Sequence, residues 1–205
     1  TWFVAVATPP PTPKITTPTA NLLTNQTNVT VGGTGTTQGS TVRLFNQGVE
    51  IGSAIVTAAK TWSINPPAFA NGTHVLTAIE TDTANVSSPM SASTMFNVDS
   101  IAPGAPLVTS PLTLVLSSSY SITGTATEAS TIRIFNGSAS GALLGTVTTS
   151  APGNTWTFPR TGATTGTYTF AITATDPATN VSAVTTHVVS VLLATAAPSI
   201  TSPIT

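Results

Sequence analysis

Apolar and polar residues alternate in short runs along the whole chain, and Gly, Pro or Asn interrupts the pattern at roughly every 8–12 residues. Residues 41–46 read TVRLFN, in which Val42 and Leu44 alternate with Arg43 and Phe45. In an extended chain this alternation places the two pairs on opposite faces of a strand. The period of two therefore predicts β-structure with one face buried.

The same pattern predicts seven strands in the first half of the chain. In the longest of them, His74, Leu76 and Ala78 share one face. Thr, Val and Ile are frequent and a helical period is absent, so we predict an all-β fold built as a two-sheet sandwich. The predicted strands lie near residues 14–23, 28–35, 41–46, 49–57, 61–65, 73–82 and 91–98.

The second half of the chain repeats the first. Four separate phrases recur in the same order with shifts of 90 to 95 residues, which indicates a tandem duplication. TVRLFN (41–46) returns as TIRIFN (131–136), KTWSIN (60–65) as NTWTFP (154–159), NGTHVLTAIETD (71–82) as TGTYTFAITATD (165–176), and ITTP (15–18) as VTSP (108–111) and again as ITSP (200–203).

The duplication predicts two tandem seven-stranded β-sandwich domains, at residues 14–99 and 107–197. The linker between them, SIAPGAP (100–106), contains two prolines that stiffen it. We expect residues 1–13 to form an apolar, strand-like segment followed by a Pro-rich linker, and residues 198–205 to form a C-terminal tail or the start of a further repeat.

Charge is scarce: five Lys and Arg and six Asp and Glu make up 5% of the 205 residues, against a typical usage of roughly 25%. The formal net charge of −1 provides no electrostatic footprint for nucleic acid. No apolar run reaches the roughly 20 residues that a membrane helix needs. A nearly uncharged surface favours packing against neighbouring protein, so we expect neighbouring repeats or identical subunits as partners.

Residues that could perform catalysis do not converge, and we predict that the chain is not an enzyme and has no cofactor. His74 occupies the repeat position of Tyr168, which is typical of a packing residue rather than a general base. Glu80 corresponds to Ala174, so no chemistry shared by the repeats depends on it. The chain has neither the Cys and His spacing of a metal site nor a phosphate-binding loop.

Two sets of aromatic residues recur in both repeats. Trp62 and Trp156 begin equivalent strands and are either core residues, the favoured interpretation, or platforms for sugar stacking. On the opposite strand face, Arg43 with Phe45 and Arg133 with Phe135 form pairs that either stack on a neighbouring subunit or glycan or form a plain surface cluster. We predict these four residues as partner contacts.

The phrases GTGTTQGSTVRLFNQG, KTWSI and VDSIAPGAP resemble the bacterial Ig-like (Big) repeats of large surface adhesins and biofilm-associated proteins. The resemblance covers nearly the whole chain in two copies. It implies an Ig-like fold for both domains, an extracellular or cell-surface location, and a role as a spacer or stalk. It also implies that calcium can rigidify the junctions between repeats.

The carboxylates that match the family's calcium pattern are Asp82, at the end of the long strand, and Asp99, before the linker prolines. The resemblance thus implies a calcium site at the junction of domains 1 and 2. The alternative, which the residues favour, is that Asp82 and its repeat partner Asp176 cap the following turns through backbone N–H groups. Calcium requires six to eight oxygen ligands, more than this junction supplies from carboxylates.

The first residues, TWFVAVAT, look like the last strand of a preceding repeat. Either the chain is part of a longer array, or Trp2, Phe3 and Val4 contact a neighbouring subunit, whose sheet edge they complete head to tail to form a filament. We therefore predict a non-catalytic extracellular structural module, either a stalk repeat of an adhesin-like protein or a filament subunit. The alternative is an accessory carbohydrate-binding module of a secreted enzyme.

Overall fold

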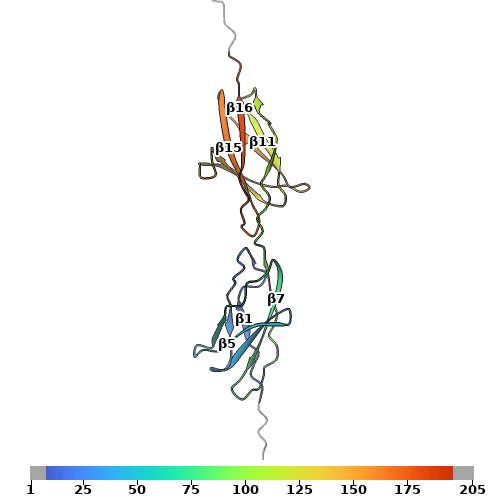
Figure 1. Cartoon of the computed structure of the whole chain (residues 1–205), viewed down its shortest axis with the longest axis vertical. Coiled ribbons are helices and arrows are strands. Elements are labelled where there is room, and N and C mark those ends of the chain that lie inside the picture. The colour runs from blue at the N-terminus through green and yellow to red at the C-terminus, as the bar shows by residue number, and fades with distance from the viewer. Residues whose placement is uncertain (1–7, 196–205) are drawn as a thin grey trace, which may run out of the picture. The chain divides into compact units, whose positions relative to one another are not determined.

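A computed structural model of the chain describes residues 8–195 (Figure 1). The described residues contain strands and no helix, and they divide into two compact units between Ile101 and Ala102. This boundary lies within the predicted linker at 100–106. The all-β prediction is confirmed, and each unit is a sandwich of two sheets.

Domain 1 pairs a three-stranded sheet, in the order β1-β3-β6, with a five-stranded sheet, in the order β2-β8-β7-β4-β5. All neighbours are antiparallel except β2 and β8, which run parallel. The strands are β1 (Lys14–Thr17), β2 (Leu23–Thr24), β3 (Val31–Thr34), β4 (Thr41–Asn46), β5 (Val49–Ile55), β6 (Thr61–Ile64), β7 (Gly72–Thr81) and β8 (Thr94–Val98).

Domain 2 repeats this topology, with sheets in the order β9-β11-β14 and β10-β16-β15-β12-β13. Its single parallel pair, β10 and β16, is the counterpart of β2 and β8. The strands are β9 (Leu107–Ser110), β10 (Leu114–Val115), β11 (Tyr120–Thr125), β12 (Thr131–Asn136), β13 (Leu143–Thr148), β14 (Thr155–Arg160), β15 (Gly166–Thr175) and β16 (Thr185–Val191).

The predicted strand over residues 14–23 is divided, which gives each domain eight strands instead of seven. β1 pairs with β3 in one sheet, and β2 pairs with β8 in the other. The division follows Pro18, which has no N–H to continue the ladder of β1. Pro111 ends β9 in the same way in domain 2.

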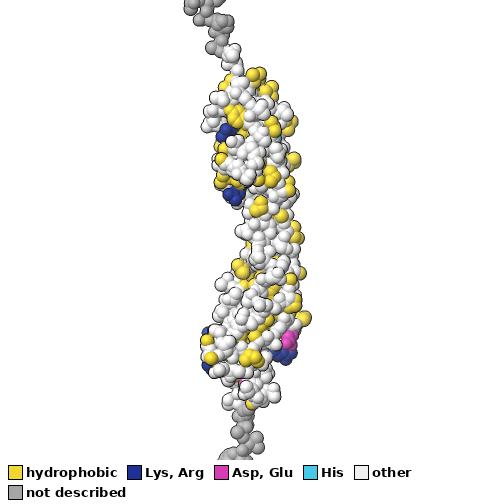
Figure 2. Space-filling view, turned by 60° about the vertical axis from the view of Figure 1, so that its left-hand side comes forward, with side chains coloured by type: hydrophobic (Ala, Val, Ile, Leu, Met, Phe, Trp, Pro, Cys, Tyr) yellow, Lys and Arg dark blue, Asp and Glu magenta, His cyan; other side chains and the backbone are white. Residues whose placement is uncertain are grey.

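The predicted strand faces are confirmed in both domains. Val42 and Leu44 of β4 are buried, as are Ile132 and Ile134 of β12. Leu76 and Ala78 of β7 complete the inner layer of the five-stranded sheet in domain 1, and the long hydrophobic side chains of β15 do so in domain 2. The face drawn in Figure 2 carries few charged side chains.

The two repeated tryptophans are core residues, as the favoured interpretation held. Trp62 is 3% exposed and Trp156 is 2% exposed, so neither ring is accessible for stacking on a sugar. Each lies opposite a glycine of the neighbouring strand, Gly33 or Gly124. A Cβ at Gly33 would come within 2.7 Å of the Trp62 ring, so the glycine is what leaves room for the indole.

Candidate functional site

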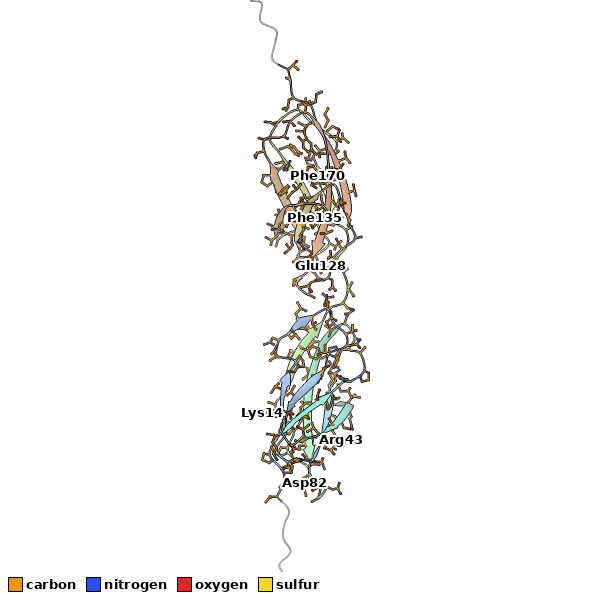
Figure 3. All side chains as sticks on the ribbon, turned by 90° about the vertical axis from the view of Figure 1, so that its left-hand side faces the viewer. Lys14, Arg43, Asp82, Glu128, Phe135 and Phe170 are labelled. Carbon is orange, nitrogen blue, oxygen red and sulfur yellow. The ribbon has the colours of Figure 1, made fainter. Side chains whose placement is uncertain are left out.

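The outward face of each five-stranded sheet carries an arginine above a phenylalanine. The guanidinium carbon of Arg43 lies 5.5 Å from the Phe45 ring centroid, and that of Arg133 lies 5.4 Å from the Phe135 ring centroid. Figure 3 labels Arg43 and Phe135, one from each pair. These distances are within the range of cation–π contacts.

The two pairs differ in their acidic neighbour. Arg43 donates from Nε to a carboxylate oxygen of Glu50 at 2.9 Å and from Nη2 to the same oxygen. The hydrogen bond from Arg43 lowers the pKa of the Glu50 carboxyl. This is the only ion pair within residues 8–195.

The position of Glu50 is taken by a leucine in the second repeat. Phe45 pairs across the sheet with Glu50, and the equivalent Phe135 pairs with Leu143. The exposed Arg133 thus has no carboxylate partner in the part of the chain that the structure describes. Partner binding by these pairs remains a prediction, with the free guanidinium in domain 2 as its strongest element.

The carboxylates of Asp82 and Asp176 cap the turns that follow β7 and β15. Asp82 Oδ1 accepts the backbone N–H of Ala84 at 2.9 Å and that of Val86 at 2.8 Å. Asp176 Oδ1 accepts the N–H of Asn180 at 2.9 Å. Both therefore have the turn-capping role that the residues favoured over calcium binding.

Asp82 and Asp99 are not brought together, which removes the basis for a calcium ion shared between them. β7 ends just before Asp82, while β8 runs antiparallel to it and ends just before Asp99, with Gly72 opposite Val98. The two carboxylates thus lie at opposite ends of the ten-residue β7, roughly 30 Å apart. Figure 3 shows Asp82 at the end of domain 1 where the described chain begins. Across residues 8–195, no group of three or more potential metal-binding side chains occurs.

His74 is a packing residue, as predicted from its exchange with Tyr168. Its ring is buried beside Phe69 and Phe96, with centroids 4.8 and 5.2 Å away. Nε2 lies 2.8 Å from the Ala70 carbonyl oxygen, and Nδ1 lies 3.0 Å from the side-chain nitrogen Nδ2 of Asn46. Both ring nitrogens are occupied within the fold, so the ring is not positioned as a general base.

Sequence reasoning missed a buried carboxylate. The Glu80 side chain has no exposed surface and accepts hydrogen bonds from the N–H groups of Thr36 and Thr37 and from the hydroxyl of Ser40. Burial acts to raise the pKa of Glu80, but the hydrogen bonds from Ser40, Thr37 and Thr36 outweigh it and lower the pKa. Glu80 therefore anchors the β3–β4 loop of domain 1, and Ala174 provides no such anchor in domain 2.

Exposed apolar side chains gather along one edge of domain 2, on β10, on β16 and on the residues next to these strands. We call this group the apolar edge: Leu112, Leu114, Leu116, Val188 and Leu192, which are between 44% and 73% exposed. The sequence contained a signal for this surface, because SVLLATAAP (190–198) has Leu192 where the first repeat has Asp99. Trp2, Phe3 and Val4, the other predicted partner contacts, lie outside the described residues.

No family model matches the chain, and no curated protein matches it. Among solved structures, it is similar to the fibronectin(III)-like modules of Clostridium thermocellum CbhA, with 21% identity and a TM-score of 0.55, over 88% of this chain and 94% of that one. It is also similar to a marsupial T cell receptor, with 11% identity and a TM-score of 0.62, over 91% of this chain and 74% of that one.

A tetra-tandem repeat from the extending region of a large adhesion protein matches 80% of this chain and 45% of that chain at 17% identity, with a TM-score of 0.35. The first two likenesses show the fold: two Ig-like or fibronectin-III-like β-sandwich modules in tandem. Within residues 8–195, the structure contains no helix long and apolar enough to cross a membrane.

Proposed function

We propose that the chain is a non-catalytic, load-bearing spacer: a pair of stalk repeats in an extracellular, adhesin-like bacterial surface protein. The observation that carries this proposal is the parallel pairing of the first and last strands of each five-stranded sheet, β2 with β8 and β10 with β16. This pairing determines how each domain responds to tension between its ends.

In domain 1, the chain enters through β1 and β2 and leaves through β8. Because β2 and β8 are parallel, entry and exit lie at opposite ends of the sandwich. Tension along the chain pulls β2 towards one end and β8 towards the other. The hydrogen bonds between them, Asn97 N–H to Leu22 O at 2.8 Å and Asp99 N–H to Thr24 O at 2.9 Å, are then loaded together in shear.

Domain 2 has the same two bonds at equivalent positions. Ser190 donates to the Thr113 carbonyl oxygen at 2.8 Å, and Leu192 donates to that of Val115 at 2.9 Å. Bonds loaded together must break together, whereas bonds at a peeled hairpin break one at a time. The repetition of this arrangement in both domains supports a mechanical role for the array.

The composition and the comparisons support the same role. The surface carries almost no charge, and Asp82 is a turn cap, His74 a packing residue and Glu80 a buried anchor. The likeness to fibronectin(III)-like modules concerns the fold, and fold alone assigns no ligand. The extracellular location rests on the resemblance to surface-protein repeats.

A second candidate function is carbohydrate binding, because Arg133 is exposed above Phe135 and has no acidic partner within the described chain. Affinity electrophoresis in gels containing neutral or acidic polysaccharide separates the two functions. A spacer migrates as it does in a gel without polysaccharide. Retardation of the wild-type chain that is lost in Arg133→Ala but kept in Arg43→Ala would favour the binding function instead.

A further inference from the structure

The apolar edge of domain 2 is a continuous surface on one face of the sheet. Leu114, which pairs with Ser190, faces outward, because its neighbour Val115 packs against the core and side chains alternate along a strand. Leu112 and Leu116 share the outward side of Leu114 because side chains alternate along a strand. Their exposed fractions are 73%, 56% and 71%, and Leu192 beside them is 55% exposed.

The first repeat has polar residues at part of this surface. The registers of β2 with β8 and β10 with β16 make Asn25 equivalent to Leu116 and Asp99 equivalent to Leu192. The same fold is therefore stable with polar residues at these two positions. Two leucines that the fold does not require, both on the surface, indicate a contact made by domain 2 alone.

The backbone at this edge is also available. β10 is the last strand of its sheet, and the carbonyl groups of Thr113 and Val115 bond to β16. In an extended strand the N–H and C=O groups of the intervening Leu114 then point away from β16. An edge of this kind accepts an added strand, with the backbone providing affinity and the side chains specificity.

A groove lies at the end of the apolar edge. It has a volume of about 440 Å³ and is lined by Leu116, Leu192, Leu193, Ala194 and Thr195. Figure 2 shows hydrophobic side chains at this end of domain 2. The groove is large enough for a bulky side chain, since a void of this size exceeds the volume of an indole ring.

We propose that the apolar edge binds residues 1–7 of a second copy of the chain, TWFVAVA, as an added strand. These residues have no charge and are apolar apart from Thr1, and Trp2, Val4 and Val6 would share one face of an extended strand. Seven extended residues span roughly 23 Å, enough to cover the five residues from Leu112 to Leu116. Trp2 is the side chain that suits the groove.

This contact joins the beginning of one copy to the end of another, so repeated contacts build a head-to-tail polymer. The inference rests on the proposed structural function, because it supplies the contact by which spacers join into longer arrays. The two are separable by experiment, since unfolding under force is measured on a single tethered chain and strand binding is measured between two.

The test uses the chain without residues 1–7, which leaves the apolar edge unoccupied, and a fluorescent peptide of residues 1–8 with a Lys-rich tail for solubility. Fluorescence anisotropy measures binding to this chain and to its Leu116→Asn/Leu192→Asp variant, which carries the residues of domain 1. We expect saturable binding to the first and at least tenfold weaker binding to the variant. A Phe3→Asp/Val4→Asp peptide is the control and is expected not to bind.

Absence of binding, or equal binding to both chains, would overturn the proposal. Sedimentation velocity of the full 205-residue chain checks the occupant. We expect concentration-dependent association that disappears both on deletion of residues 1–7 and in Leu116→Asn/Leu192→Asp. Association that survives the deletion but not the double substitution would also overturn it, because the apolar edges of two copies, or residues 196–205, would then be the occupants.

Discussion

At the position of Glu80 the two repeats differ in charge. The Glu80 carboxylate accepts hydrogen bonds from two backbone N–H groups and two hydroxyls of the β3–β4 loop, while Ala174 stands at this position in domain 2. A buried carboxylate is stable only when its oxygens are well bonded. The bonds are charge-assisted, which makes them stronger than those between neutral groups.

Replacing Glu80 with Gln removes the charge and places an NH2 donor where one of the two carboxylate oxygens accepted a hydrogen bond. We expect domain 1 to lose about 1–3 kcal/mol of its free energy of unfolding. Hydrogen exchange read separately on peptides of each domain measures the loss. Ala174→Gly in domain 2 is the control, and an effect spread over both domains would contradict the account.

The same carboxylate makes domain 1 sensitive to acid. The pKa of Glu80 is lowered in the folded chain, so its contribution is present above the unfolded pKa of about 4.3 and is lost as the pH falls below that value. Hydrogen exchange between pH 6 and pH 3 is expected to show protection in domain 1 falling in wild type more than in Glu80→Gln. Equal slopes in the two proteins would refute the role of Glu80.

The burial of residues in a period-two pattern could be predicted from the sequence. The role of residues that depend on a distant contact could not. The alternation in TVRLFN was sufficient to place Val42 and Leu44 in the core. Glu80 is a charged residue on the inward face of β7. Its partners Thr36 and Ser40 lie 44 and 40 positions earlier in the sequence. Because the second repeat has Ala174 at this position, Glu80 looked dispensable in the sequence. It nevertheless anchors a loop in the first repeat.

At the scale of elements, β3 requires a glycine at the position opposite Trp62 more strictly than at the neighbouring position. A Cβ on Gly33 would collide with the Lys14 carbonyl oxygen and lie 2.7 Å from the Trp62 ring, whereas a Cβ on Gly32 would meet its nearest atom at 3.2 Å. Gly33 therefore fixes the spacing of β1, β3 and β6.

We expect Gly33→Ala to destabilise domain 1 by about 1–3 kcal/mol or more, because the backbone of β1 must move. Gly32→Ala, one residue earlier on the same strand, is the matched control and should cost less. Urea unfolding followed by Trp62 fluorescence in a Trp2→Phe/Trp156→Phe background measures both. Similar midpoints for the two variants would contradict the packing described for this sheet.

The parallel strands β2 and β8 were not predicted as such. β2 has two residues, too few to produce an alternating pattern, and the pattern over 14–23 does not reveal that the chain changes sheets after Pro18. The missing information is tertiary, since it lies in the hydrogen bonds of Asn97 and Asp99 to residues more than 70 positions earlier.

Asp99→Pro removes one of the bonds that join β2 to β8, because proline has no N–H to donate to Thr24. Under tension we expect one of the two unfolding events per molecule to move to lower force, while the other, from domain 2, is unchanged. Asp99→Ala retains the N–H and is the control. Equal forces for the Pro and Ala variants would mean that these bonds do not bear the load.

At the scale of the whole molecule, the duplication in the sequence was enough to predict two domains of one fold. Four recurring phrases located both copies, and the fold of each agrees with that of solved Ig-like and fibronectin-III-like modules. The shared calcium ion was not supported, because the antiparallel course of β7 and β8 separates Asp82 from Asp99. The resemblance predicted the fold correctly, whereas the two carboxylates that it placed in one site lie far apart.

We propose that the chain bears load through two independently folded domains. Single-molecule force spectroscopy on the 205-residue chain, tethered by its ends, tests this proposal. We predict two discrete unfolding events, each releasing on the order of 250–300 Å of chain, with forces that do not change when calcium is removed by a chelator. Smooth extension without discrete events, or a single event for both domains, would contradict the account.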